Sequence, residues 1–201
     1  ALLWADCWWT SASAEPILFG EFSEAASALL DSLGDQSDST RIRLIYQPDH
    51  LVSEVVECPN GNRSTLQSAL QTDYPALADP KLAWSFEPIN AASNSTLLHY
   101  ETQPGLLGLL DTLTASGFEI EGVWPLASVL NFVPVDWPET GALTVLAIAH
   151  QRTLVYKHTP AGIRQVNKAR GDAAAKLAAT TIQQSHDSDT TAFYFIALDT
   201  S

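Results

Sequence analysis

The sequence predicts an α/β protein in which two similar units flank an inserted segment. Three observations lead to this prediction. Residues 2–48 and 143–198 both read as three short strands, a helix and a further strand. Residues 52–126 between them read as strand, helix, strand, strand, helix, strand. Of the 201 residues, 46% are hydrophobic and 16% charged, which is typical of a globular core rather than a disordered chain.

The first unit begins with three strands, in "LLWADC", "WTSASA" and "ILFGEF", joined by tight turns. A helix capped at Ser23 is expected next, because Ala26, Leu29, Leu30 and Leu33 recur on one helical face. The strand "RIRLIYQP" completes the unit. The predicted order is therefore βββαβ.

The inserted segment alternates strands and helices. "VSEVVECP" reads as a strand, and residues 64–77 as a helix with Leu66, Ala69, Leu70 and Tyr74 on one face. "LAWSFEPI" and "TLLHYETQ" follow as strands. A leucine-rich helix then begins near Pro104 and ends at Gly117, before the strand "FEIEGVWPL". This βαββαβ order is that of the ferredoxin-like split βαβ arrangement.

The second unit repeats the pattern of the first. "LTVLAIAH", "RTLVYKHT" and "GIRQVNKA" are predicted strands, separated by turns at Gln151 and "PAG". A helix capped at Asp172 follows, with Ala174, Leu177, Ala178 and Ile182 inward, and "TAFYFIAL" is the last strand. The similarity between the units is one of pattern rather than of letters, so two unrelated α/β segments remain an alternative.

Charge and cysteine content exclude several kinds of function. With 10 basic and 23 acidic residues the net charge is −13. This charge disfavours nucleic acid as a partner, and it also disfavours binding to a membrane surface through a polybasic face of the protein. No apolar run approaches the roughly 20 residues that a spanning helix needs. The two cysteines, Cys7 and Cys58, form no disulfide framework. The chain begins at Ala1 without a signal-peptide pattern, and we expect it to be part of a longer protein.

Duplicated βββαβ units with a small α/β insert after the first copy resemble the actin-like ATPase fold, which is ribonuclease H-like. The insert, from "VSEVVECP" through "LQTDYPAL" to "LAWSFEPI", and the stretch "LLGLLDTLTASGFEIEGVWPLASVL" are similar to the type IV pilus protein PilM and the type II secretion protein GspL. The resemblance implies three subdomains: 1–50, actin-like; 51–133, the ferredoxin-like insert; and 134–201, a second actin-like subdomain that we expect to be truncated.

Nucleotide-binding members of this superfamily carry an Asp and a Gly in the first turn of each copy. Glycine lets backbone N–H groups approach the phosphates, while the carboxylate holds a hydrated metal ion. The first copy keeps the acid, Asp6, but continues with Cys7, Trp8 and Trp9. The second copy has His150 and Gln151 in the corresponding turn, with no acid or glycine. We therefore predict vestigial phosphate turns at Asp6 and His150 and no ATP hydrolysis, although Asp6 as a simple turn cap remains an alternative.

Other residue patterns indicate no further chemistry. The five histidines, His50, His99, His150, His158 and His186, have no spacing typical of a zinc site, and no GxSxG elbow is present. Cys58 is expected to be a small buried residue. The tryptophans near predicted element ends are expected in the core or, alternatively, as anchors for a partner: Trp8, Trp9, Trp124 and Trp137. We predict no catalytic residues, cofactor or metal.

The resemblance implies a non-enzymatic scaffold of a bacterial type II secretion or type IV pilus platform at the inner membrane. Its expected partners are an assembly ATPase and a membrane-anchored platform protein, and a homodimer is left open. The protein is expected in the cytoplasm, held at the inner membrane by partners or by a segment outside residues 1–201. The alternative is an actin-like ATPase or sugar-kinase fragment that binds Mg-ATP.

Overall fold

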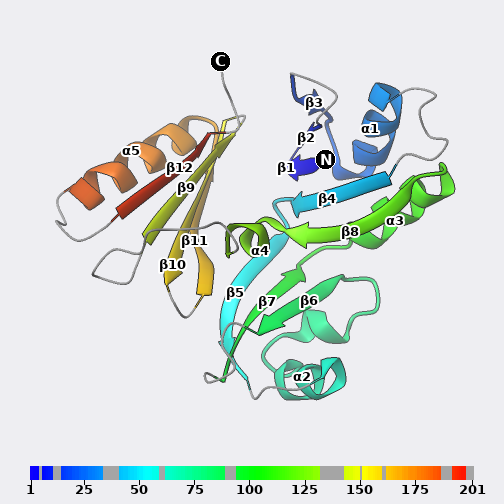
Figure 1. Cartoon of the computed structure of the whole chain (residues 1–201), viewed down its shortest axis with the longest axis horizontal. Coiled ribbons are helices and arrows are strands. Elements are labelled where there is room, and N and C mark those ends of the chain that lie inside the picture. Colours follow the sequence, from blue (N-terminus) through cyan, green and yellow to red (C-terminus); the bar gives the residue numbers. More distant parts are fainter. Residues whose placement is uncertain are drawn as a thin grey trace. The chain divides into compact units, whose positions relative to one another are not determined.

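A computed structural model of the chain describes residues 1–4, 6–10, 15–33, 41–58, 62–88, 94–131, 143–149, 151–159, 162–186 and 192–197. They form strands and helices of a mixed α/β protein, as predicted (Figure 1). The chain divides into two compact units. The first comprises residues 1–52, 61–86 and 98–129, and the second comprises residues 53–60, 87–97 and 130–201. None of the helices within the described ranges is long and apolar enough to cross a membrane.

The first unit contains a five-stranded sheet in the order β3-β2-β1-β4-β8. β1 (Leu2–Trp4) pairs antiparallel with β2 (Cys7–Trp9), which pairs antiparallel with β3 (Ile17–Leu18). β4 (Arg41–Gln47) lies parallel to β1 on the other side. Along β4, Ile42, Leu44 and Tyr46 are buried, whereas Arg41 and Arg43 are exposed. This alternation gives one face of the strand to the core.

The helix of the first unit starts differently from the prediction. A 3₁₀ turn, η1 (Phe22–Glu24), precedes α1 (Ala25–Leu33). Glu24 Oε2 accepts hydrogen bonds from the backbone N–H groups of Gly20 (3.0 Å) and Glu21 (3.2 Å). The predicted cap at Ser23 is therefore wrong, because the N-cap is Glu21, whose backbone N–H is bound by the carboxylate of Glu24 three residues later.

The strand predicted to complete the insert belongs instead to the first sheet. β8 (Glu119–Pro125) pairs in parallel with β4. The preceding helix, α3 (Leu106–Ala115), places Leu109 and Leu113 in the same core as Leu29 of α1. The ferredoxin-like four-stranded sheet is therefore not formed, because the apolar faces of α3 and β8 are buried against the first unit. Local periodicity predicted both elements but carries no information on their neighbours.

The remaining strands of the predicted insert form a three-stranded sheet in the order β5-β7-β6. They are β5 (Leu51–Glu57), β6 (Trp84–Pro88) and β7 (Ser95–Glu101). α2 (Arg63–Leu70) is shorter than predicted and is followed by the 3₁₀ turn η3 (Pro75–Ala78). A proline at position 75 cannot continue a helix, since it lacks an N–H donor and restricts the residue before it.

The core of the first unit is formed by side chains from β1, β2, β4, α1 and α3. Trp8 is fully buried, and its indole Nε1 donates a hydrogen bond to the carbonyl of Ala25 (2.7 Å), which fixes the start of α1. The buried members of this core are Leu3, Trp8, Ala25, Ala26, Leu29, Ile42, Leu44, Tyr46, Leu51, Leu109, Leu113 and Phe118. A short helix, α4 (Leu126–Asn131), follows β8.

The second unit contains a four-stranded sheet in the order β11-β10-β9-β12. β9 (Leu143–Ala149), β10 (Arg152–Thr159) and β11 (Gly162–Arg170) form an antiparallel meander, and β12 (Ala192–Ala197) lies parallel to β9. The order and directions match those of β3, β2, β1 and β4 in the first sheet. α5 (Asp172–His186) packs on one face, where Thr153 Oγ1 donates to the carbonyl of Ala174 (3.0 Å).

Candidate functional site

The predicted phosphate turn of the first unit is occupied by aromatic side chains. Asp6 lies in the turn between β1 and β2, and its carbonyl accepts a hydrogen bond from the N–H of Phe19 (3.0 Å). Trp8, next to the turn, is fully buried. A phosphate cradle is favoured by glycine and other small residues at the turn, whereas Cys7, Trp8 and Trp9 follow Asp6 here. The second predicted turn, at His150, lies outside the described residues, and the vestigial character of both turns stays a prediction.

Three buried donors belong to the β1–β2 hairpin and the residue directly after it. Within the described part of the chain, the indole Nε1 of Trp4, the indole Nε1 of Trp9 and the hydroxyl of Thr10 have no hydrogen-bond partner. A buried polar group without a partner costs about 1–3 kcal/mol. Trp4 lies at the turn end of the hairpin, whereas Trp9 lies opposite Leu2 at the other end, so the three donors do not converge on Asp6.

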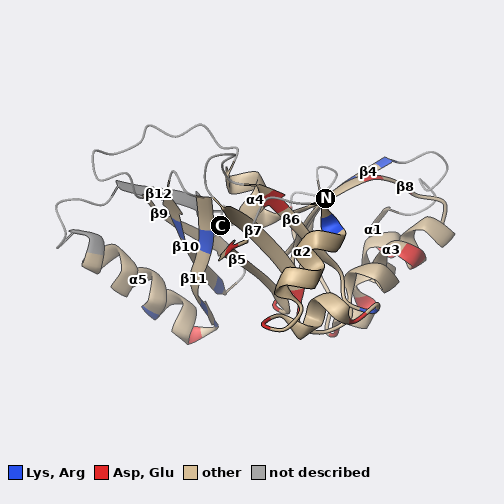
Figure 2. Cartoon of the chain, turned by 90° about the horizontal axis from the view of Figure 1, so that it is seen from below, with Lys and Arg blue, Asp and Glu red and all other residues tan. Residues whose placement is uncertain are grey.

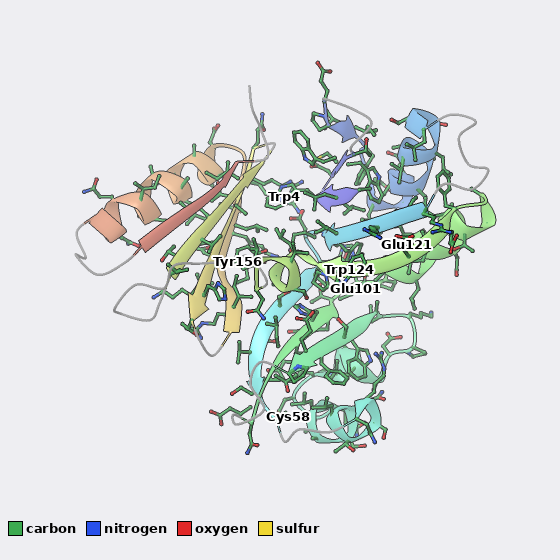
Figure 3. The ribbon with its side chains drawn as sticks, in the orientation of Figure 1. Trp4, Cys58, Glu101, Glu121, Trp124 and Tyr156 are labelled. Carbon is green, nitrogen blue, oxygen red and sulfur yellow. The ribbon has the colours of Figure 1, made fainter. Side chains whose placement is uncertain are left out.

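The principal candidate site is a polar cluster around Glu101, at the end of β7 (Figure 3). Glu101 has no exposed side-chain surface. Its Oε1 accepts from the hydroxyl of Tyr46 (2.5 Å) and the N–H of Leu106 (2.8 Å), and it lies 3.2 Å from His50 Nε2. Its Oε2 accepts from the N–H of Ala83 (2.9 Å). One carboxylate thus joins β4, the turn after β4, the segment before β6 and the first turn of α3.

The ionisation of the cluster follows from these contacts. Burial opposes the charged form of Glu101, but hydrogen bonds from His50, Tyr46, Ala83 and Leu106 outweigh it and hold the pKa of the carboxyl below its usual value. Burial, followed by the negative charge and the hydrogen bond of Glu101, strongly raises the pKa of the Tyr46 phenol. At neutral pH the cluster therefore contains a carboxylate and a neutral phenol.

Gly105, just before α3, allows this cluster to close. A Cβ atom at this position would lie 2.5 Å from His50 Nε2 and 2.8 Å from Phe22 Cε1. The His50 and Phe22 rings are in edge contact, with centroids 4.8 Å apart. The carbonyl of His50 also accepts from the N–H of Thr102 (2.9 Å). The glycine is required by close packing and not by an unusual backbone angle.

A second buried polar pair lies nearby in the first unit. His99 of β7 and Ser128 of α4 are both buried, with Nε2 and Oγ 3.0 Å apart. Burial lowers the pKa of His99 to about 4, so the ring is neutral at physiological pH. Because Ser128 has no exposed surface, the pair is suited to hold α4 against β7 rather than to attack a substrate.

Two cavities of the first unit adjoin the Glu101 cluster. One, of about 220 Å³, has a mostly apolar wall with polar groups at one side; it is lined by Tyr46, Leu51, Ala83, Trp84, Ser85, His99, Glu101, Leu106, Leu110, Val123 and Pro125. The other, of about 380 Å³, lies between η1, α1 and α3; it is lined by Phe22, Ser23, Ala26, Lys81, Pro104, Gly105, Gly108, Leu109 and Thr112. Apolar walls with a few fixed polar groups are typical of binding sites.

Other residues that the sequence analysis singled out take structural positions. Cys58 is buried, and burial raises the pKa of its thiol, as expected for an unreactive cysteine. His158 is buried in β10, and burial lowers the pKa of its ring. Trp124 is 39% exposed on β8, so an anchoring role for it stays a prediction. Trp137 lies outside the described residues.

Metal ligation has no support in the part of the chain that the structure describes. No three His, Cys, Asp or Glu side chains there are grouped so that they could hold an ion. Among the histidines, His50 and His99 both lie near Glu101, and His186 ends α5.

Sequence reasoning did not identify Glu101 as a site residue. The available signal was an acidic residue at the end of the apolar strand "TLLHYE", two positions after His99 and therefore on the same strand face. Leu106 follows five residues later, but the partners Tyr46 and Ala83 are 55 and 18 residues away, so only the tertiary structure brings them to Glu101.

Comparison with solved structures identifies related folds. The cytoplasmic domain of EpsL, an inner-membrane component of the Vibrio cholerae type II secretion system, matches with a TM-score of 0.52 and 18% identity, over 97% of this chain and 79% of that one. A chain of the PilM–PilN type IV pilus biogenesis complex matches with a TM-score of 0.47 and 14% identity, over 84% of this chain and 52% of that one. The present chain thus spans about half of that protein.

A third match is a Bacteroides thetaiotaomicron protein of unknown function described as having an actin-like ATPase fold, with a TM-score of 0.48 and 5% identity, over 88% of this chain and 68% of that one. No protein-family model matches the sequence, and no curated protein matches it at the sequence level. The EpsL match confirms, at the level of the fold, the predicted resemblance to a secretion-system component.

Proposed function

We propose that this chain is a non-enzymatic scaffold of a bacterial type II secretion or type IV pilus platform at the inner membrane. The observation that carries the proposal is the fold, shared over 97% of the chain with the cytoplasmic domain of an inner-membrane type II secretion component. The inference from fold to role is one of analogy. We place the protein on the cytoplasmic side of the inner membrane, held there by partners or by a segment outside residues 1–201.

The matching strand orders of the two sheets support the further proposal that the units are copies of one actin-like βββαβ unit. In this proposal the insert begins near residue 50 and the second copy begins near residue 133. The β4–β8 pairing adds a refinement, in which α3 and β8 are counted with the first copy.

The Glu101 cluster favours binding over catalysis. All the contacts of this carboxylate are made within the protein, and it has no exposed surface from which to exchange a proton with a substrate. The rigid wall that it forms borders the 220 Å³ cavity. We propose that this cavity accepts apolar side chains of a short segment of the membrane-anchored platform protein. The assembly ATPase is proposed to bind elsewhere on the chain.

The test uses a labelled peptide from the cytoplasmic segment of the membrane-anchored platform protein. Leu110 lines the cavity, whereas Leu107 on the same helix is 42% exposed and does not line it. We expect Leu110→Gln to weaken the peptide complex about tenfold in fluorescence anisotropy, and Leu107→Gln to leave it unchanged. Equal affinities for both variants, or no complex with the native chain, would contradict the proposal.

The alternative function is Mg-ATP binding by an incomplete actin-like ATPase or sugar kinase. The observation that favours it is the buried indole Nε1 of Trp4, two residues before Asp6, which has no hydrogen-bond partner in the described structure. A ligand present at a hundred times its dissociation constant stabilises a protein by about 2.7 kcal/mol. Thermal unfolding with and without Mg-ATP distinguishes the two functions, since the scaffold proposal predicts no shift beyond that produced by Mg²⁺ alone.

A further inference from the structure

The basic residues of this acidic protein are concentrated in one segment. Residues 152–176 contain six of the ten Lys and Arg residues and only one of the 23 acidic residues, Asp172. Five of these cations are exposed: Lys157 on β10, Arg164, Lys168 and Arg170 on β11, and Lys176 on α5. Figure 2 shows the corresponding blue segments on β10, β11 and α5. Residues 152–176 therefore form a locally basic segment within a chain of net charge −13.

Like charges oppose one another across the β10–β11 hairpin. Lys157 lies directly opposite Arg164, and Arg152 lies directly opposite Arg170. Directly opposed like charges destabilise a strand pair. Among the described residues, neither Lys157 nor Arg164 forms a salt bridge. The hairpin thus contains a repulsive pair, Lys157–Arg164, that has no neutralising acid in the described structure.

Protection of a sheet edge does not account for this charge. β11 is an edge strand of its sheet, and charged residues on an edge strand discourage unwanted pairing. However, β10 is an interior strand, and it contributes Arg152 and Lys157 opposite the cations of β11. An acidic residue at either position would preserve the charged edge and also stabilise the hairpin. The repulsion is better explained by an anionic partner that relieves it.

The register of the hairpin determines the shape of that partner. Lys168 and Arg170 lie on one face of the sheet, together with Leu154. The register shift between Val155 and Tyr156 places Arg164 on the opposite face, with Lys157. Thr153, which bonds to α5, shares that second face. Cations therefore flank the edge on both sides, and a flat bilayer could contact only one of the two sets.

We propose that the β11 edge and its flanking cations, Lys157, Arg164, Lys168 and Arg170, bind an extended acidic segment of a protein partner. The segment lies along the edge so that its carboxylates reach cations on both faces, while Val166, 42% exposed, offers an apolar contact between them. This surface belongs to the second unit alone, and the proposal does not depend on the secretion-platform function.

The test measures binding of a fluorescein-labelled poly-Glu peptide, with a Gly-Ser peptide of equal length as the neutral probe. We expect salt-sensitive binding of poly-Glu and no binding of the Gly-Ser peptide.

Arg164→Glu should weaken poly-Glu binding about tenfold, because it replaces an attraction by a repulsion. The same variant places an opposite charge across from Lys157, so its thermal midpoint should be equal to or above that of the native chain. Lys81→Glu, in the first unit, makes the same change of charge and should bind like the native chain.

Three results would overturn the proposal. The first is equal weakening by Arg164→Glu and Lys81→Glu, which would indicate an effect of net charge only. The second is binding to vesicles of phosphatidylglycerol and phosphatidylcholine without binding to poly-Glu, which would assign the surface to a membrane. The third is salt-sensitive self-association in sedimentation without binding to poly-Glu, which would assign it to the acidic surface of a second copy.

Discussion

The replacement Glu101→Gln tests whether one buried carboxylate holds the first unit together. In its best orientation, the amide oxygen of glutamine keeps the contacts to Tyr46, His50 and Leu106, but the NH₂ group then faces the N–H of Ala83. One accepted hydrogen bond is lost, and the others change from charged to neutral bonds, each weaker by about 1 kcal/mol. Because glutamine is neutral, the variant no longer has the cost of burying a charge, and this gain offsets part of the loss. The expected net destabilisation is about 3 kcal/mol.

Urea unfolding at neutral pH, followed by tryptophan fluorescence, measures this change in the free energy of unfolding. Glu119→Gln is the matched control, since Glu119 is 67% exposed and its contact with Arg41 is a surface ion pair at 3.2 Å. The control should change stability by less than about 0.5 kcal/mol. If Glu101→Gln also stayed within about 0.5 kcal/mol of the native chain, the carboxylate would not be holding these elements together, and our reasoning about the cluster would be refuted.

Two further predictions concern neighbouring residues. Gly105→Ala should destabilise the protein by about 1–3 kcal/mol, because its methyl group would lie 2.5 Å from His50 Nε2. Gly108→Ala should stabilise α3 by about 0.5–1 kcal/mol, because a methyl group there would meet nothing within 4 Å. The two variants should shift the urea denaturation midpoint in opposite directions. Folding lowers the pKa of His99 from 6.5 to about 4, so between these two pH values the unfolded chain binds a proton that the folded chain does not. The free energy of unfolding should therefore fall as the pH drops from 6.5 to 4, by about 3 kcal/mol in total. His99→Gln should flatten this pH dependence of the urea midpoint, and an unchanged slope would rule out His99 as its source.

Local sequence signals predicted the second unit well. The strand predicted in "RTLVYKHT" coincides with β10, and those in "LTVLAIAH" and "GIRQVNKA" differ from β9 and β11 by one residue at one end. The start of α5 at Asp172 also agrees. Alternating apolar residues and sharp turns define these elements without reference to the rest of the chain. At Gly117, the predicted helix end coincides with a backbone φ of 91°, which glycine adopts readily.

Predictions that needed long-range pairing were less successful. β8 has the pattern of a strand, but its place beside β4 depends on α3, whose Leu109 and Leu113 pack in the core of the first unit. The sequence order alone favoured a compact βαββαβ insert. The Glu101 cluster escaped prediction for the same reason, since Tyr46 and His50 are more than 50 residues from Glu101 along the chain. Neither periodicity nor a motif records such a convergence.

The Glu101 cluster also bears on how the neighbouring cavity would bind a partner. The side chains of Tyr46, Glu101 and Leu106 line that cavity, and the carboxylate fixes the other two through hydrogen bonds. A wall held in this way loses little conformational freedom when a ligand enters, so less of the binding energy is spent on ordering it. A charge buried far from solvent is costly, yet here it joins the elements that shape one apolar cavity. This arrangement is more consistent with a preformed binding surface than with a proton-transfer site, in which the carboxylate would need a free oxygen facing the substrate.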